Sequence, residues 1–593
     1  MKTRKNAILA LDPGMAPITT GNTPNILFYI RTRYHSRGWN KYRYKRIGVL
    51  EQRWLSMVVA YLSAEIGFES GLHTYSGGLG VLAGDHLKSA ADAGLDVVGC
   101  TLLYREGYGK QHLDDEGNQT ETFGEIDPNE FLCDTGVEIT LPLDGTTLHS
   151  KIWVYRIKGL PTYFLDTRHP DNSPNHTNLG NRLYGGDDST RIRQEYLLGV
   201  GGIRALQALG HDITGLHLNE GHCTFAALEM LHQGWTREQL SQRTLFTTHT
   251  PVPAGHDRFS WEEVEEVLGD LLPSDAQEIA DSEDTCSMSH LGIGLCGTVN
   301  AVSGLNAKVA QSMFPGTVIH PITNGVHHIT WTSDSFKLLF DDIDSEWRNK
   351  PQHIGSMSFP NSRLLEAKEK SRQELRNKVL EETGIQLNPN YLTIGFARRF
   401  ATYKRANLVF KNIKRLREIG AHKIQFVFAG KAHPKDEGGK MLIKSIFEGA
   451  KDIQEEIPVI FLQNYSMETG LLMTAGSDIW LNNPIRPMEA SGTSGMKAAM
   501  NGTPNCSILD GWWPEACIHG VNGWAIGNGE DDRDDDRDAE NILNVLENEV
   551  LPAWENQEKW LEIMKQSIIS SAAFTGSRMM DDYKRFYSAF DTS

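Results

Sequence analysis

Lys497 is the single lysine in a stretch of small residues, Met488–Asp510. A glycine-rich loop feeds a short predicted helix there, and Asn501-Gly502 is a plausible end for that helix. The free N–H groups of a helix start, with the hydroxyls of Thr493 and Ser494, can bind a phosphate. A lysine one turn along could bond covalently to an aldehyde cofactor that carries this phosphate. The alternative is an ordinary loop-to-helix turn with a lysine on the surface.

A second stretch, Gly395–Arg405, gathers four cations. Arg398 and Arg399 end a predicted strand, and Lys404 and Arg405 open a predicted helix. Cations in a first helical turn face the positive end of the helix dipole, which costs about 0.3–1 kcal/mol each. An anion bound between the four cations removes this penalty and their mutual repulsion, so the stretch predicts an anion site. The alternative is that the side chains splay into water.

Further polar groups stand at the ends of predicted strands. Residues 58–104 read as strand, Gly-rich turn, helix and strand, a βαβ order in which the turn Ser76–Val81 either holds a phosphate or packs tightly. Two later strands end in Glu220, His222, His249 and His256, and the pair His327-His328 follows another. Their spacing fits no usual zinc pattern, so we expect polar lining and no metal.

Two sets of alternating strands and helices would position these groups. Strands alternate with helices from Val58, and a second alternation follows a charged helix predicted at Leu364–Glu382. In parallel α/β sheets the carboxyl ends of the strands line the ligand crevice. The sequence therefore predicts the α/β class, with one α/β domain at 56–335 and a second at 336–593 that ends in helices. The acidic run Glu530–Glu540 is expected to be a solvated loop rather than a calcium site.

Residues 1–55 differ from the rest and are predicted to be a basic N-terminal extension. The stretch Arg31–Arg46 is rich in Lys, Arg and Tyr. It is either an arm that meets polysaccharide, an anionic surface or a partner subunit, or a solvated tail or helix packed on the acidic body.

The bulk composition narrows the classes of function. The 593-residue chain has a net charge of −18, which argues against a general nucleic-acid binder. Its seven cysteines form no close C-x-x-C pair, which favours a reduced compartment, and the expected location is the cytoplasm. No apolar run approaches the ~20 residues needed to span a bilayer, so no membrane partner is expected.

Together these stretches resemble the α-glucan (glycogen, starch and maltodextrin) phosphorylases. GTSGMK resembles their pyridoxal phosphate lysine motif, and ARRFATYKR resembles their phosphate-recognition segment. Between Val58 and Trp513 the family's other motifs follow in order: AYLSAEIGFESG, YSGGLGVLAGDHLKSA, HLNEGHCTFAALE, THTPVPAGHDRF, NGVHHITW and GKAHPKDEGGK. The short bacterial and archaeal-type members are the nearest likeness.

This resemblance implies two Rossmann-like domains facing a central cleft, a fold of the glycosyltransferase-B type. It also implies reversible phosphorolysis of α-1,4-glucans such as glycogen and maltodextrin from the non-reducing end. Inorganic phosphate would be consumed and α-glucose 1-phosphate released with retention of configuration. The cofactor would be pyridoxal 5'-phosphate, and in this family its phosphate, rather than its ring, works as a proton relay beside the substrate phosphate. The resemblance is also compatible with a homodimer.

Roles for individual residues follow from motif position alone. Lys497 would form the Schiff base with pyridoxal phosphate, and Arg399, Lys404 and His249 would be the catalytic residues. Thr493, Ser494 and Arg398 would hold the cofactor's phosphate, with Tyr465 beside it. Arg399 and Lys404, helped by the backbone at Gly78, would bind the substrate phosphate, while Glu489, Ser491, Gly492, Asn324 and His249 would contact the glucosyl unit.

The chain departs from the family pattern at several places. Its N-terminal part does not match the regulatory region of the long animal and plant enzymes, which puts control by phosphorylation or nucleotide in doubt. Ser466, Asn306 and Ala301 stand where an arginine, a histidine and a glycine are common, which could alter glucan contacts. Two rival functions are a nucleotide-sugar glucan synthase, which shares the fold but lacks the GTSGMK lysine, and a non-catalytic glucan-binding scaffold.

Overall fold

A computed structural model describes residues 29–36, 39–46, 56–252, 255–280 and 282–590. The chain divides into two units, residues 1–56 and residues 57–593. In the first unit, β1 (Tyr29–Ser36) and β2 (Trp39–Arg46) pair as an antiparallel hairpin. The basic stretch therefore holds strands, and the packed-helix alternative is wrong. The side chains of this hairpin lie outside the described part, so the hypothesis of a basic arm stays a prediction.

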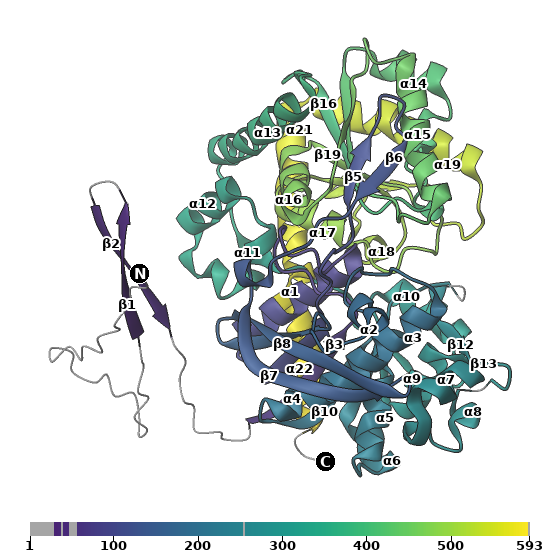
Figure 1. Cartoon of the computed structure of the whole chain (residues 1–593). Helices are drawn as coiled ribbons and strands as arrows, with labels where there is room; N and C mark the ends of the chain where they lie inside the picture. The colour runs from purple at the N-terminus through teal and green to yellow at the C-terminus, as the bar shows by residue number, and fades with distance from the viewer. Residues whose placement is uncertain (1–28, 37–38, 47–55, 253–254, 281, 591–593) are drawn as a thin grey trace. The chain divides into compact units, whose positions relative to one another are not determined.

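A large mixed sheet forms the first framework of the second unit (Figure 1). Within the described residues it has nine strands in the order β15-β14-β11-β10-β3-β4-β9-β8-β7. Its pairs are parallel from β15 to β10 and from β3 to β9, and β8 runs antiparallel to both β9 and β7. The strands are β3 (Ser56–Ser63), β4 (Val97–Leu102), β7 (Cys133–Leu143), β8 (Thr146–Ile157), β9 (Leu160–Asp166), β10 (His211–Asn219), β11 (Thr244–Thr248), β14 (Thr298–Ala301) and β15 (Ile319–Pro321).

A second sheet has six strands, and every neighbouring pair in it is parallel. The order is β18-β17-β16-β19-β20-β21, with β16 (Leu392–Ala397), β17 (Ile424–Ala429), β18 (Val459–Leu462), β19 (Ile479–Asn482), β20 (Asn505–Ile508) and β21 (Gly523–Ile526). All six residues of β16 and of β17 are buried. Strands buried along their whole length are typical of sheets covered by helices on both faces, and the predicted α/β class is confirmed.

Helices cover both sheets. In the first half they are α1 (Gly78–Asp92), α2 (Pro174–Asn178), α3 (Asp188–Tyr196), α4 (Gly202–Ala208), α5 (Phe225–His232), α6 (Arg237–Arg243), α7 (Trp261–Leu268), α8 (Ala276–Ile279), α9 (Met288–Leu295) and α10 (Gly304–Met313). In the second half they are α11 (His328–Trp331), α12 (Asp334–Ile343), α13 (Asn361–Thr383), α14 (Ile413–Gly420), α15 (Glu437–Lys451), α16 (Met467–Gly476), α17 (Thr493–Met500), α18 (Trp513–Ala516), α19 (Asp535–Val545), α20 (Leu551–Trp554), α21 (Gln557–Ser571) and α22 (Gly576–Phe590). Small two-stranded ladders pair β5 (Lys110–Leu113) with β6 (Gln119–Thr122) and β12 (Arg258–Ser260) with β13 (Thr285–Ser287).

The last helix, α22, returns to the first sheet. The Tyr587 hydroxyl lies 2.8 Å from Nε2 of His86 on α1 and 2.7 Å from Nδ1 of His217 on β10. Tyr583 and Phe590 belong to the same buried cluster as Val59 of β3. The chain thus returns to the first sheet after the second sheet is complete, and helices α1 and α17 lie between the two sheets in Figure 1.

Hydrogen bonds join loops of the two halves close to α17. Ser303 Oγ donates to the carbonyl of Ala490 at 2.8 Å, and the Gly304 N–H donates to Glu515 Oε1 at 2.7 Å. The first bond holds the segment that precedes Lys497, and the second holds α18, which follows it, against the start of α10.

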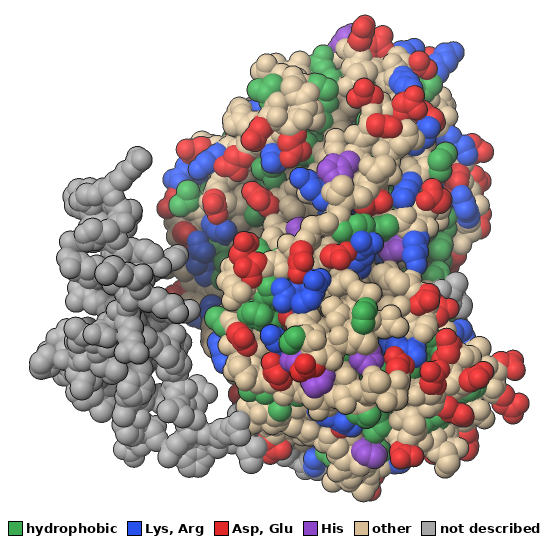
Figure 2. Space-filling view, in the orientation of Figure 1, with side chains coloured by type: hydrophobic (Ala, Val, Ile, Leu, Met, Phe, Trp, Pro, Cys, Tyr) green, Lys and Arg blue, Asp and Glu red, His purple; other side chains and the backbone are tan. Residues whose placement is uncertain are grey.

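Acidic and basic side chains are intermixed on the face drawn in Figure 2. Among the described residues, no helix combines the length and apolar character needed to cross a membrane.

Candidate active site

Lys497 is buried on α17, with 5% of its surface exposed, so the surface-lysine alternative is wrong. Gly492 precedes the helix with φ +83°, a left-handed conformation that glycine adopts without strain. No side chain caps the N-terminus of α17, which leaves its first N–H groups without a side-chain partner. The helix ends at Met500, and Asn501 caps it as predicted.

The Lys497 ammonium lies on an aromatic face instead of in an ion pair. Its Nζ is 3.5 Å from the ring centroid of Trp331, and among the described residues it makes no hydrogen bond or ion pair. Burial lowers the pKa of Lys497 to about 8, against the attraction of Asp85 and with the repulsion of Lys88. A larger fraction of this amine is therefore neutral, and nucleophilic, near pH 7 than for an exposed lysine.

The cation-rich segment folds differently from the prediction. Residues Thr402–Lys404 form a single 3-10 turn, and α14 begins only at Ile413. Arg405 adopts a left-handed conformation with φ +49°, which ends the turn. The expectation that Lys404 and Arg405 open a helix is wrong, because the backbone reverses at Arg405.

Glu489 draws two of the four cations together. Its Oε2 lies 2.6 Å from Arg398 Nη2 and 2.7 Å from Lys404 Nζ, and all three side chains are at least nine-tenths buried. Burial alone would raise the pKa of Glu489, but Arg398 and Lys404 hold it below its ordinary value. The structure thus places a carboxylate between Arg398 and Lys404.

A second carboxylate, Asp510, supports Glu489 from behind. Asp510 Oδ2 accepts the Glu489 N–H at 2.9 Å, and Oδ1 accepts the Gly511 N–H at 2.7 Å. Burial and the charge of Glu489 raise the pKa of Asp510 to about 7. Sequence reasoning missed Asp510, although its place directly after β20, at the carboxyl edge of a parallel sheet, is a signal for a site residue.

The other two cations have separate surroundings. Arg405 Nη1 pairs with Asp535 at 2.9 Å and with Asp538 at 2.8 Å, so it takes no part in the predicted four-cation anion site. Since α19 begins at Asp535, the expectation that Glu530–Glu540 is all loop is also wrong. Arg399 is exposed and, within the described residues, has no ion pair or hydrogen bond.

The glycine-rich turn lies beside Arg399. A Cβ on Gly77 would sit 4.0 Å from side-chain carbons of Arg399, and Gly78 is the first residue of α1. No side chain caps α1, and Gly78 is exposed. Arg399 and an open helix start therefore face the same space, an arrangement that suits an anion.

His249 and Glu220 meet in the first half. The Glu220 Oε2 accepts the N–H groups of His249 and Thr250 at 2.8 and 3.1 Å, and His249 Nε2 lies 2.7 Å from Asn219 Oδ1. Burial lowers the pKa of His249 to about 4. Glu220 Oε2 and His249 Nε2, two atoms that could bind a metal, are therefore already hydrogen-bonded to backbone N–H groups and to an amide oxygen.

Three predicted residues carry polar groups with incomplete hydrogen bonding. The buried atoms Ser491 Oγ and Asn324 Oδ1 have no partner among the described residues. Within the described part of the chain, Ser494 Oγ accepts only the Trp480 indole N–H, at 3.2 Å. Thr493, the first residue of α17, and Tyr465, which follows β18, are both partly buried.

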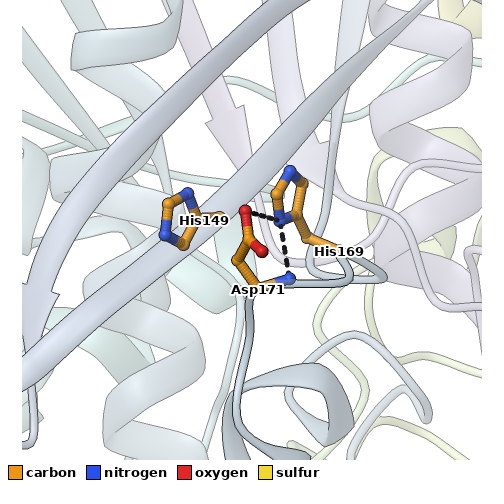
Figure 3. A group of neighbouring side chains, drawn as sticks. All are labelled: His149, His169 and Asp171. Carbon is orange, nitrogen blue, oxygen red and sulfur yellow. Dashed lines mark hydrogen bonds and ion pairs between the residues drawn. The ribbon is translucent and has the colours of Figure 1, made fainter.

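A candidate metal-ligand group lies elsewhere, among His149 on β8 and His169 and Asp171 after β9 (Figure 3). The two imidazole rings stack at 4.8 Å with an interplanar angle of 10°, and one ligand atom of each of the three residues lies within 4.8 Å of the others. The Asp171 N–H already donates to His169 Nδ1 at 3.2 Å. We assign no metal to this group.

Comparison with known proteins identifies the family. A model described as carbohydrate phosphorylase matches residues 212–515. Maltodextrin phosphorylase of Thermococcus litoralis is 39% identical, over 89% of this chain and 70% of the relative. Glycogen phosphorylase of Mycobacterium tuberculosis is 36% identical, over 90% and 70%, and glycogen phosphorylase of Aquifex aeolicus is 34% identical, over 89% and 86%. The chain belongs to the carbohydrate phosphorylase family.

Membership in the carbohydrate phosphorylase family confirms the resemblance found in the sequence. In this phosphorylase family member, Arg398, Lys404 and Glu489 form one contact group, Lys497 lies against Trp331, and Arg399 lies beside the turn that contains Gly78.

Proposed function

We propose that the chain catalyses reversible phosphorolysis of α-1,4-glucans from the non-reducing end. Inorganic phosphate would be consumed, and α-glucose 1-phosphate would be released with retention of configuration. The observation that carries this proposal is the buried, unpaired Lys497 on a helix with an uncapped N-terminus, in a chain of the carbohydrate phosphorylase family. Maltodextrin and glycogen phosphorylases among its relatives supply the substrate class.

The donor set around Lys497 fits pyridoxal 5'-phosphate. The Lys497 amine has no competing partner among the described residues, and the face of Trp331 offers a surface for a planar ring. Thr493, Ser494 and the N–H groups of α17 would hold the cofactor's phosphate with Arg398, whose buried Nε has no partner within the described residues, and Tyr465 would lie beside it. When bound, the cofactor would supply a phosphate that exchanges a proton with the substrate phosphate.

The substrate phosphate would bind at Arg399 and Lys404, next to the backbone of Gly78. Arg399 is the cation of its segment that has no carboxylate partner in the described structure. Lys404 shares the carboxylate of Glu489 with Arg398, which we assign to the cofactor's phosphate. Cations placed between two phosphates would offset their repulsion in a dry site.

The glucosyl unit would contact Glu489, Ser491, Gly492, Asn324 and His249. A buried hydroxyl or amide without a partner costs about 1–3 kcal/mol, and sugar hydroxyls would remove this cost at Ser491 and Asn324. His249 would act as a neutral imidazole, since its pKa of about 4 leaves it uncharged at neutral pH.

We also propose the glycosyltransferase-B arrangement, with Rossmann-like domains at 56–335 and 336–593 facing a central cleft. Its support is the pair of sheets whose connecting loops meet at Ser303 and Ala490. A cytoplasmic location and a homodimer belong to this proposal as well.

A trapping experiment tests the proposal. Incubation with pyridoxal phosphate and borohydride should leave a reduced adduct on Lys497, and Lys497→Ala should lose both the adduct and activity. Phosphate with maltooligosaccharides of increasing length should release glucose 1-phosphate. No adduct on Lys497 favours the nucleotide-sugar synthase, whereas an adduct without turnover at any length favours the scaffold.

A further inference from the structure

Asp85 is a buried carboxylate that none of the roles above uses. It lies on α1 with 1% of its surface exposed. Both carboxylate oxygens accept from one donor, the Trp331 indole Nε1–H, at 2.9 and 2.7 Å. Trp331, at the end of α11, is the residue whose ring face carries the Lys497 ammonium.

The hydrogen bonding of Asp85 is incomplete. An ionised carboxylate offers about four acceptor positions, and a buried one is stable only when donors or cations fill them. Among the described residues, the single shared indole N–H is its only hydrogen-bond donor, and no cation lies within ion-pair distance of it. Asp85 therefore has acceptor capacity to spare next to the proposed cofactor lysine.

Two lysines interact electrostatically with Asp85, and both have other contacts. Lys88, also on α1, donates to the Phe68 carbonyl at 3.2 Å and to Thr330 Oγ1 at 3.3 Å. Lys497 lies over the indole face of Trp331 and would be consumed by the covalent link to the cofactor. Once that link forms, the Lys497 nitrogen is held by the cofactor and cannot turn toward Asp85, so it does not fill the spare acceptor positions of the carboxylate.

Building on the proposed function, we propose that Asp85 accepts a hydrogen bond from the pyridine nitrogen of the cofactor held at Lys497 and keeps that nitrogen protonated. The carboxylate can only accept, so it selects a donor and repels the cofactor's phosphate. An aspartate partner for the pyridinium nitrogen is a recurring device in pyridoxal phosphate proteins. Asp85 would thus fix the ring end of the cofactor while Thr493, Ser494 and Arg398 fix its phosphate end.

Ring protonation is measurable without any turnover. Apoprotein is loaded with pyridoxal phosphate labelled with 15N in the ring, and the 15N resonance reports whether the bound nitrogen is protonated. The parent protein should give the protonated signal at pH 7, and Asp85→Asn should give the neutral one. Asp92→Asn is the matched control, because Asp92 lies on the same helix but pairs with His327 and Lys158.

The second measurement is the affinity of the apoprotein for the cofactor and for an analogue without the ring nitrogen. The comparison on the parent protein needs no variant. The parent should bind pyridoxal phosphate about tenfold more tightly than its 1-deaza analogue, the order expected for one charge-assisted hydrogen bond. Asp85→Asn should show a smaller preference, because its amide N–H can donate only an uncharged hydrogen bond to the neutral ring nitrogen. The comparison on the parent stands even where Asp85→Asn fails to fold, since parent protein with equal affinity for the two compounds overturns the proposal.

The outcomes separate this inference from the proposed function. Borohydride trapping at Lys497 in the parent, with the same neutral 15N signal in the parent and in Asp85→Asn, contradicts the role of Asp85 alone. A parent that forms no adduct at Lys497 contradicts the proposed function and this inference together.

Discussion

Arg398 and Arg399 are neighbours in the chain, yet their surroundings are opposite. Arg398 is nine-tenths buried and shares the carboxylate of Glu489 with Lys404. Arg399 is exposed beside the Gly77 turn, and within the described residues no carboxylate pairs with it. Since β16 ends at Ala397, successive side chains leave the sheet in different directions, one toward the interior and one toward the helix start of α1.

The difference separates Arg398 and Lys404, which already share an internal carboxylate, from Arg399, which has no carboxylate partner among the described residues. A buried ion pair contributes little net stability, but removing one partner leaves a charge buried alone. Arg398, Lys404 and Glu489 therefore depend on one another. Arg399 has no such dependence, so a mobile anion can use its charge without breaking an internal pair. Arg405, tied to Asp535 and Asp538, belongs with the structural group.

The largest effect is expected for Glu489→Ala. This change leaves Arg398 and Lys404 buried without their shared carboxylate, which should destabilise the protein by about 3–5 kcal/mol and remove activity. Urea unfolding of the apoprotein measures the loss. Added inorganic phosphate should restore part of the stability of Glu489→Ala and little of it in the parent. An unchanged urea midpoint for the variant contradicts the dependence of the two cations on Glu489.

Local sequence patterns were enough to predict the strands and the helix end that position Lys497. The apolar runs that became β16, β17 and β20 predicted the strands, and Asn501-Gly502 predicted the end of α17, because these features act over a few neighbouring residues. Together they located Lys497 at the correct place on a helix.

Contacts between distant residues were not predictable in the same way. The link from Trp331 to Asp85 spans 246 positions, and that from Glu489 to Arg398 spans 91. The left-handed turn at Arg405 depends on Asp535 and on the Asn483 and Pro484 carbonyls, which no propensity of Arg405 encodes. The helix-dipole argument predicted an anion among the four cations because the sequence did not show that Glu489 pairs with Arg398 and Lys404.

A smaller effect, dependent on pH, is expected at Asp510 behind the paired cations. Its pKa in the folded state is about 7, above the value of about 3.9 in an unfolded chain. The unfolded state therefore releases this proton first, and stability is full at low pH and declines as pH rises from about 4 to about 7, by up to about 4 kcal/mol. Asp510→Asn should remove this decline when urea midpoints are compared across that range.

Asp535→Asn is the control for the pH series. The Asp535 pKa is lowered to about 2, chiefly by Arg533, with Arg405 contributing. Its stabilising effect is therefore present above about pH 4 and lost only at lower pH. A decline that persists unchanged in Asp510→Asn between pH 4 and 7 would assign the titration to another group.

The smallest effect on stability, and the clearest on ligand binding, is expected for Arg399→Ala. Because Arg399 has no ion pair within the described structure, its loss should change the free energy of unfolding by less than about 0.5 kcal/mol. The KM for phosphate should rise about a hundredfold, the loss of one or two charge-assisted hydrogen bonds, with cofactor still bound to Lys497. Arg398→Ala is the matched variant and should instead lose stability and retain less cofactor. If Arg399→Ala lost the cofactor and kept its affinity for phosphate, the two neighbouring arginines would have exchanged roles, and the division between paired and free cations would not predict where the anion binds.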